Sequence, residues 1–487
     1  MFRRPNKKQL FIRRVITYVV MVLAVIVIVV GTILFIMGYR VDSDKGRIEQ
    51  GALIQFDSQP NGAAVSIDGI SINANTPSKQ TVVAGQHSFV VTRAKYEDWS
   101  KTLNVKAGTL EWLDYIRLVP KDLKVESIET YTSLYGEKSS PDDKWTLVQQ
   151  KADVPSFQLI DLRSSQVKSS TVVLPADKYS DAATAGVAHT FTMESWDEDG
   201  RHMIIKHSFN DKTEYIVMDT QDVATSVNVS SLLNIALSEV EFSGTSGNIL
   251  YGVTDGVLRK LDLSNATISR GLVTYVKNFD IYKTDVISYT GFDPVNTAHQ
   301  VAGVYREGDE FPHVLRVVKD TTTPLTIDAT RYYSDDYVAI SEGPLTTILK
   351  GRYPSSTATD NSSMKVYATF NSVANVASTS FSETGSRLVV QSGLTFVGYE
   401  VEYKRATKAS IAATDQTPRP LSWLDDAYVW AVHDNKLSIR EFDGSNAHVI
   451  MGMEPGFDAT LSQNGKYLYG IAKIGDTYHL QRVMMIL

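Results

Sequence analysis

Residues 140–148 read Ser-Pro-Asp-Asp-Lys-Trp-Thr-Leu-Val, a polar turn that leads into an apolar strand. The same arrangement recurs with other residues at 197–205, 242–251, 381–390, 423–432 and 461–469. In several copies a second strand follows and ends in another polar turn. One such unit cannot bury both of its faces alone. Repeats spaced by roughly 40–55 residues are typical of β-propeller blades, which bury their faces against one another.

The number of copies predicts the size of the ring. The interval from Gly247 to Gly385 leaves room for two weakly marked copies, near Asn296 and Gly343. We therefore predict a seven- or eight-bladed propeller over residues 121–487. Residues near 121–135 are expected to complete the last blade, because closure leaves few exposed strand edges. The copies resemble the S-P-D-G repeats of TolB-like and WD40-like β-propellers, although only the first keeps Ser-Pro-Asp.

A smaller β-rich segment, residues 50–120, precedes the repeats. Apolar residues alternate along it, and Asp68-Gly69 is a two-residue hairpin signal. Its turn residues follow a recognisable order: Ser58-Gln59-Pro60-Asn61-Gly62-Ala63-Ala64-Val65, Asp68-Gly69, Thr76-Pro77, Ala84-Gly85-Gln86-His87 and Tyr96. Residues 52–120 thus resemble the PEGA domain, with Ala74 and Lys95 at positions where that family usually has glycine. The resemblance implies a small extracytoplasmic β-sandwich without catalytic chemistry.

The segment Val15–Met37 contains no charged residue. At 1.5 Å per residue a helix of this length spans roughly 34 Å, slightly more than the hydrocarbon core of a bilayer. It is too long for a cleaved signal peptide, so we predict one transmembrane helix over residues 15–37 that follows a basic tail, residues 1–14. The positive-inside rule places that tail in the cytoplasm and residues 40–487 outside it.

The net charge is unevenly distributed. The chain carries −7 in total, and residues 1–40 carry seven basic and no acidic side chains, which leaves −14 for the remainder. An acidic ectodomain repels phosphate backbones, so we expect no nucleic-acid partner. The chain has no cysteine, which excludes disulfides, thiolate metal sites and cysteine nucleophiles.

Several residues were weighed as candidate sites. We interpret His87 as a turn histidine and not a ligand, and Trp99 and Trp112 as core residues and not a sugar-stacking platform. His202 and His207 lie five residues apart on one strand, so they face opposite sides and are not expected to share a metal. Residues 197–200, Asp-Glu-Asp-Gly, resemble part of a calcium loop but are better explained as a hairpin turn. No catalytic, cofactor-binding or metal site is predicted.

Other features were assigned to loops and turns. Gln166–Thr190 and Pro354–Ser380 are predicted as long loops, which could bind a ligand or be insertions without one. The acidic residues after the second strands, Asp161, Asp219 and Asp262, are predicted turn formers. Glycosylation sequons occur at Asn228, Asn265 and Asn361.

These inferences favour a mainly β, single-pass membrane protein that acts as a binding or scaffold module. Its expected contacts are the lipid bilayer, through residues 15–37, and an envelope protein or cell-wall glycan. The alternative is an envelope hydrolase or lyase that uses the central opening of the propeller. A third possibility is a structural spacer, which would recruit partners even without residues 121–487.

Overall fold

The computed structural model describes residues 7–36, 39–42, 47–184, 186–354 and 362–487. The chain divides into two compact units, Met1–Asp122 and Leu123–Leu487. Each unit is described by itself.

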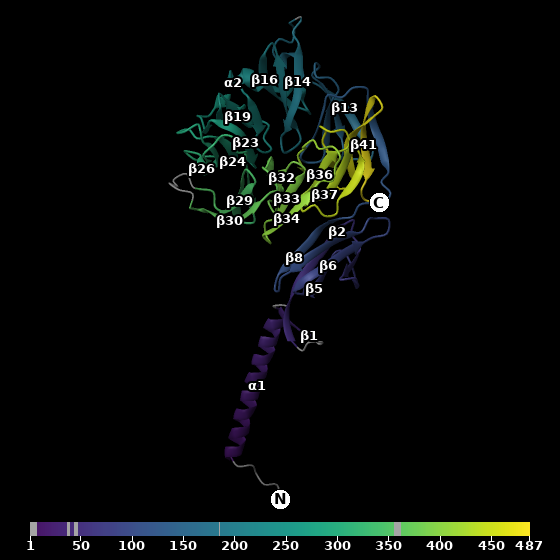
Figure 1. The fold of residues 1–487 in the computed structure, drawn as a ribbon, viewed down its shortest axis with the longest axis vertical. Helices are drawn as coiled ribbons and strands as arrows, with labels where there is room; N and C mark the ends of the chain where they lie inside the picture. The colour runs from purple at the N-terminus through teal and green to yellow at the C-terminus, as the bar shows by residue number, and fades with distance from the viewer. Residues whose placement is uncertain (1–6, 37–38, 43–46, 185, 355–361) are drawn as a thin grey trace. The chain divides into compact units, whose positions relative to one another are not determined.

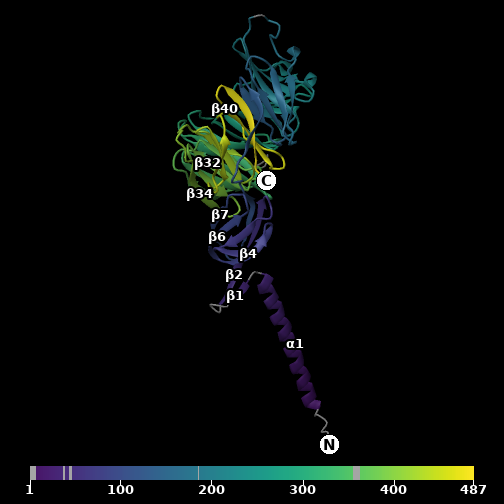
Figure 2. The ribbon, with the colours of Figure 1, turned by 90° about the vertical axis from the view of Figure 1, so that its right-hand side faces the viewer.

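The first unit begins with one long apolar helix, α1 (Lys7–Ile36), drawn as a continuous coil in Figures 1 and 2. Its segment Phe11–Leu34 has a mean hydropathy of 2.9, and none of it is buried in the protein. The helix is therefore long and apolar enough to cross a membrane, as predicted. It starts before the expected Val15, within the predicted basic tail.

The rest of the first unit consists of two small β-sheets. One sheet has the order β1-β2-β5, with β8 paired parallel to β2, and the other has the order β4-β3-β6-β7. Their bounds are β1 Tyr39–Asp42, β2 Arg47–Gln59, β3 Ala64–Ile67, β4 Ile70–Asn75, β5 Ser78–Val83, β6 Gly85–Thr92, β7 Trp99–Val105 and β8 Leu110–Arg117. Both sheets contribute to one core, in which the rings of Phe56 and Phe89 lie 5.7 Å apart. The predicted hairpin at Asp68-Gly69 joins β3 to β4, and both residues have positive φ.

The second unit is a ring of antiparallel sheets, which in Figure 1 follow one another from blue through teal and green to yellow. Within the described residues there are eight sheets. The strands of the first four are β10 Gly136–Ser139, β11 Trp145–Gln149, β12 Ser156–Asp161 and β13 Lys168–Val173; β14 His189–Trp196, β15 His202–Phe209, β16 Lys212–Asp219 and β17 Val227–Asn228; β18 Glu239–Phe242, β19 Ile249–Thr254, β20 Val257–Asp262, β21 Thr267–Ile268 and β22 Val273–Thr274; and β23 Val276–Tyr282, β24 Val286–Phe292, β25 Gln300–Arg306 and β26 His313–Val318.

The strands of the other four sheets are β27 Leu325–Tyr332, β28 Asp335–Glu342, β29 Leu345–Gly351 and β30 Met364–Asn371; β31 Ser378–Phe381, β32 Arg387–Ser392, β33 Thr395–Glu400 and β34 Arg405–Ser410; β35 Ser422–Trp423, β36 Tyr428–His433, β37 Lys436–Glu441 and β38 His448–Gly452; and β39 Thr460–Leu461, β40 Tyr467–Ile474, β41 Thr477–Met484 and β9 Val125–Tyr131. Short helical turns lie at η1 Ala176–Lys178, η2 Val223–Thr225 and α2 Val229–Leu233.

The last sheet closes the ring as the sequence predicted. Strand β9, from the start of the unit, pairs antiparallel with β41 from its end, with Val125 opposite Val483 and Tyr131 opposite Tyr478. In Figure 1 the yellow β41 accordingly lies beside the blue β13. Closure joins chain segments more than 340 residues apart, so the ring depends on both ends of the unit.

The hydrophobic cores lie between neighbouring sheets. One cluster combines Leu147 and Phe157 of the first sheet with Phe191 and Ile216 of the second, and the following clusters continue this arrangement around the ring. Each sheet therefore buries both faces only through its neighbours, which is why the repeat forms a ring. The indole of Trp196 also donates a hydrogen bond of 3.1 Å to the Lys138 carbonyl in the preceding sheet.

The two repeats predicted near Asn296 and Gly343 exist, but these residues lie one turn further along the sheet than the turns that mark the other repeats. Asn296 lies in the turn between β24 and β25, and Gly343 in the turn between β28 and β29. Both are turns between the second and third strands, whereas the other copies were recognised by the turn between the first and second. The first turns of these two sheets also carry polar residues, Lys283-Thr284-Asp285 in one and Tyr333-Ser334 before Asp335 in the other, but the repeat pattern did not identify them.

Candidate functional site

The propeller has two unlike faces. We call distal the face that carries the turns between second and third strands and the connections between sheets. We call the opposite face proximal. Strand β9 begins there, because its first residue, Val125, pairs with Val483 at the end of β41 that lies away from the β40–β41 turn. Large apolar side chains exposed in turns and connections lie mostly on the distal face: Tyr135, Val154, Leu232, Tyr275, Val295, Val373 and Ile474. The proximal turns in the described part of the ring expose Phe311 and Tyr333.

A chain of hydrogen bonds reaches the distal face in the second sheet. The Glu214 carboxylate on β16 lies 2.8 Å from Nδ1 of His207 on β15, and Nε2 of His207 lies 2.9 Å from Nδ1 of His189 on β14. His207 is fully buried between the stacked rings of Phe191 and Phe209. His189, at the start of its strand, is half-buried. The three side chains form a relay from a buried carboxylate to a partly exposed imidazole.

The ionisation of Glu214 determines the proton positions in this relay. Burial raises the pKa of Glu214, but hydrogen bonds from His207, Asn228 and Ser180 outweigh it and lower the pKa to about 2. An ionised carboxylate only accepts, so His207 donates to it from Nδ1; in this tautomer of neutral His207, Nε2 accepts from His189. Nε2 of neutral His189 is therefore left as a hydrogen-bond acceptor at the surface. Such an oriented imidazole can bind a proton donor from a ligand.

The segment Gln166–Thr190, predicted as a loop, partly covers the relay. Ser180 donates to Glu214 from its backbone N at 2.8 Å and from its Oγ at 2.7 Å, and the Tyr179 ring meets the rings of His189 and His207 edge-on. The loop prediction was too broad, because β13 lies within this segment. Pro354–Ser380 was likewise too broad, since it contains β30, while its residues 355–361 lie outside the described part of the chain.

The innermost strands carry carboxylates toward the centre of the ring. Burial, with Asp280 and Glu239 nearby, raises the pKa of Glu241 to about 8, and burial beside Asp280 also raises the pKa of Asp328. Some of these carboxylates join neighbouring sheets. Asp328 accepts from Phe381 N at 2.6 Å, and Glu137 accepts from Asp458 N at 2.7 Å. These two acids therefore have a structural use as interblade hydrogen-bond acceptors.

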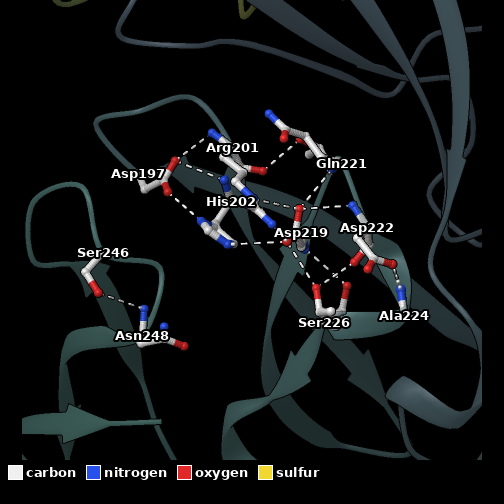
Figure 3. Close-up of polar contacts among 12 residues, drawn as sticks. Asp197, Arg201, His202, Asp219, Gln221, Asp222, Ala224, Ser226, Ser246 and Asn248 are labelled. Atoms are coloured by element: carbon white, nitrogen blue, oxygen red, sulfur yellow. Dashed lines mark hydrogen bonds and ion pairs between the residues drawn. The ribbon is translucent and has the colours of Figure 1, made fainter. Parts of the chain in front are cut away.

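The acidic turn at residues 197–200 is a hairpin turn, as interpreted from the sequence (Figure 3). The fully buried Asp197 carboxylate accepts from Arg201 N at 2.8 Å, from His202 N at 2.9 Å and from His202 Nδ1 at 2.6 Å. Asp219, at the end of β16, accepts from the Arg201 guanidinium and from Gln221 N. The carboxylate of Asp197 is thus already occupied within the turn.

The predicted turn formers act as expected. Asp161 accepts from Arg163 N at 3.0 Å, Asp219 from Gln221 N at 3.0 Å and Asp262 from Asn265 N at 3.0 Å. Each carboxylate thus caps a backbone N–H two or three residues further on, which is the Asx-turn arrangement.

The other singled-out residues are structural. His87 is buried and bonds Asp68 Oδ2 at 2.6 Å and the Val83 carbonyl at 2.9 Å. Trp99 belongs to the core of the first unit, as predicted, whereas the prediction for Trp112 is wrong, because this residue is half-buried on β8 and outside that core.

The remaining polar candidates separate in the structure. His202 and His207 bond to different partners, Asp197 and Glu214, so they do not share a site. Among the sequons, Asn228 caps α2 and Asn265 lies in a turn, while Asn361 is outside the described residues. In the described residues no three His, Asp or Glu side chains are grouped as a metal site requires.

The relay itself was missed by sequence analysis. Its histidines are separated by 18 residues and lie on adjacent strands, where Phe191 pairs with His207. The available signal was the repeated His-x-Phe at 189–191 and 207–209, which places each histidine beside a phenylalanine on the same face of its strand.

Comparison with protein families finds one match, within the first unit. Residues 52–120 match the PEGA domain model. This PEGA segment covers a minor part of the chain. At Lys95, where the family usually has glycine, the backbone keeps the left-handed conformation that glycine favours, with φ 73°. No curated protein matches the chain.

Solved structures resemble the chain in fold. Kluyveromyces lactis Hsv2 is 12% identical, with 66% of this chain and 100% of that chain covered at a TM-score of 0.40. An oligogalacturonate lyase in complex with manganese is 11% identical, with 74% and 98% covered at a TM-score of 0.39. At this similarity neither protein informs the ligand of this chain.

Proposed function

We propose that this chain is a single-pass membrane protein that displays a ligand-binding β-propeller outside the cytoplasm. The apolar helix α1, no part of which is buried in the protein between Phe11 and Leu34, serves as the membrane anchor. The basic residues among positions 1–14, at and before the start of α1, support a cytoplasmic N-terminus. The PEGA-like unit then connects the anchor to the ring.

The exposed apolar side chains in the distal turns and connections carry the binding proposal. Val295 is 94% exposed and Val373 69% exposed, which costs free energy in water unless a partner covers them. Strand β9 begins at the proximal face, at Val125 opposite Val483. The ligand class we favour is an envelope protein or cell-wall glycan.

Photo-crosslinking in intact cells tests this proposal. A photoreactive amino acid placed at Val295 on the distal face should form crosslinks to envelope material. The same amino acid at Tyr333, 77% exposed on the proximal face, serves as the matched control. Equal crosslinking from both positions, or none from either, would contradict a distal binding face.

One observation favours the alternative of an envelope hydrolase or lyase. Glu241 has a pKa of about 8, so it is protonated at neutral pH and could act as a general acid in the central opening. The alternative predicts turnover of an envelope polymer by the full-length protein that is abolished in Glu241→Gln. Turnover that survives this substitution would exclude Glu241 as the acid.

A further inference from the structure

An open hollow lies on the distal face between the fourth and fifth sheets of the ring. Its volume is about 390 Å³, within the range of small-ligand sites. Its walls come from three segments: residues 322–324 between the two sheets, residues 342–345 at the turn of the fifth sheet, and Asn375 before the sixth. Arg316 on β26 completes the lining. Three separate parts of the chain therefore converge here.

Hydrogen bonds within the protein hold the walls in place, so the hollow exists before a ligand binds. Gly343 N donates to the Pro324 carbonyl at 2.9 Å, and Val376 N donates to the Gly343 carbonyl at 2.9 Å. Asp320 accepts from the backbone N and the hydroxyl of Thr323 and holds the first wall in place. A preformed hollow avoids the entropic cost of ordering loops when a ligand binds.

Gly343 keeps the hollow open. Its φ is +56°, and a Cβ at this position would lie 3.4 Å from Asn375 Oδ1 and 3.5 Å from Thr323 Cγ2. A side chain here would both strain the backbone and fill the space between the walls.

The lining indicates the chemistry of the ligand. Pro324, Pro344 and Leu345 supply apolar surface, and the exposed Asn375 amide makes no hydrogen bond to another described residue. An Asn amide offers both donors and an acceptor, so it can pair with both groups of a peptide bond. Arg316 and Glu342 form an ion pair with each other, with Arg316 Nε 2.6 Å from Glu342 Oε2, and contribute no net charge.

The same lining disfavours a glycan. Sugar rings pack their apolar faces on aromatic side chains, and the lining residues include no Trp, Tyr or Phe. At the rim, Val373 follows Ser372, whose backbone N bonds the Pro344 carbonyl, and is itself 69% exposed. An apolar side chain of a peptide would continue onto this valine.

We infer that the hollow binds an extended, uncharged peptide segment of an envelope protein, with an apolar side chain over Pro324, Pro344 and Leu345 and a backbone amide on Asn375. This inference rests on the proposed function, because it names the ligand class of the distal face.

The test uses the full-length protein in detergent micelles and a library of extended peptides. Peptides that carry an apolar residue among uncharged ones should be recovered. Asn375→Trp, which fills the hollow from an exposed position, should weaken their binding at least tenfold. Ser264→Trp adds the same ring to an exposed proximal turn and should leave binding unchanged.

The outcomes separate this inference from the proposed function. Recovery of no peptide, or binding that Asn375→Trp does not weaken, overturns the inference. Recovery of glycan fragments that compete at the hollow also overturns it. In each of these cases distal crosslinking from Val295 decides independently whether the distal face binds a partner at all.

Discussion

The segment around Ser180 covers the histidine relay, and we predict that the negative charge of Glu214 holds it there. A substitution that removes this charge tests the prediction. Glu214 is 4% exposed and accepts two hydrogen bonds from Ser180 and one from His207. Its pKa falls from 4.5 to about 2 on folding. A difference of roughly 2.5 units corresponds to about 3 kcal/mol in favour of the folded state.

The sign of the pH dependence follows from the lowered pKa. The stabilising contribution is fully present above pH 4.5 and is lost as the pH falls toward 2, where the carboxylate becomes protonated in both states. Hydrogen bonds of His207 and Asn228 supply part of the lowered pKa and do not depend on Ser180. Glu214→Gln should therefore lower the free energy of opening around Ser180 by less than about 3 kcal/mol at pH 7, and by about half of that loss at pH 3.

Amide hydrogen exchange of the full-length protein measures this effect directly, because Ser180 N donates to Glu214 Oε1. Faster exchange of a peptide that contains Ser180 is expected in Glu214→Gln. Asp211→Asn, on the exposed turn between β15 and β16, is the control and should leave exchange unchanged. Unchanged protection of Ser180 in Glu214→Gln, or an equal loss at both pH values, would refute this account of the relay.

Three further predictions concern the ring. Gly247→Ala should destabilise the propeller by about 1–3 kcal/mol in thermal or urea unfolding, because its Cβ would meet ring atoms of His202 at 2.4–2.6 Å; Gly452→Ala, whose Cβ would lie 3.9 Å from the Asn435 carbonyl oxygen, is the control and an equal loss would refute the steric reason. Asp197→Ala should cost about 2–4 kcal/mol, because it leaves buried donors unpaired, whereas the exposed Asp199→Ala should cost less than about 0.5 kcal/mol. Removal of β41 should abolish cooperative unfolding of the whole ring, since β9 loses its partner and β40 keeps only β39; a ring that still unfolds in one transition would contradict closure through β9.

The architecture could largely be predicted from sequence because it rests on local signals. Turns such as Ser140–Lys144 precede apolar strands, and this pattern predicted the sheets and the closing role of the residues near 121–135. The pattern did not identify the first turns of two sheets, although Asp285 lies in one of them and Asp335 directly follows the other. The turn between the second and third strands then stood out instead.

The candidate site could not be predicted in the same way. The relay from Glu214 to His189 crosses three strands, and the hollow next to Asn375 joins segments from three sheets. Sequence periodicity gives the face of a residue on its own strand, but it does not give the register between strands or the packing of connections. The relay and the hollow could therefore be found only in the three-dimensional structure.

The central claim is tested most directly by determining on which side of the membrane the propeller lies. The chain has no native cysteine, so single cysteines report their position without background. In intact cells a membrane-impermeant maleimide should label Val295→Cys on the distal face and should label Asn6→Cys, before α1, only after the membrane is permeabilised. Labelling of Asn6→Cys but not of Val295→Cys in intact cells would contradict an anchored propeller displayed outside the cytoplasm.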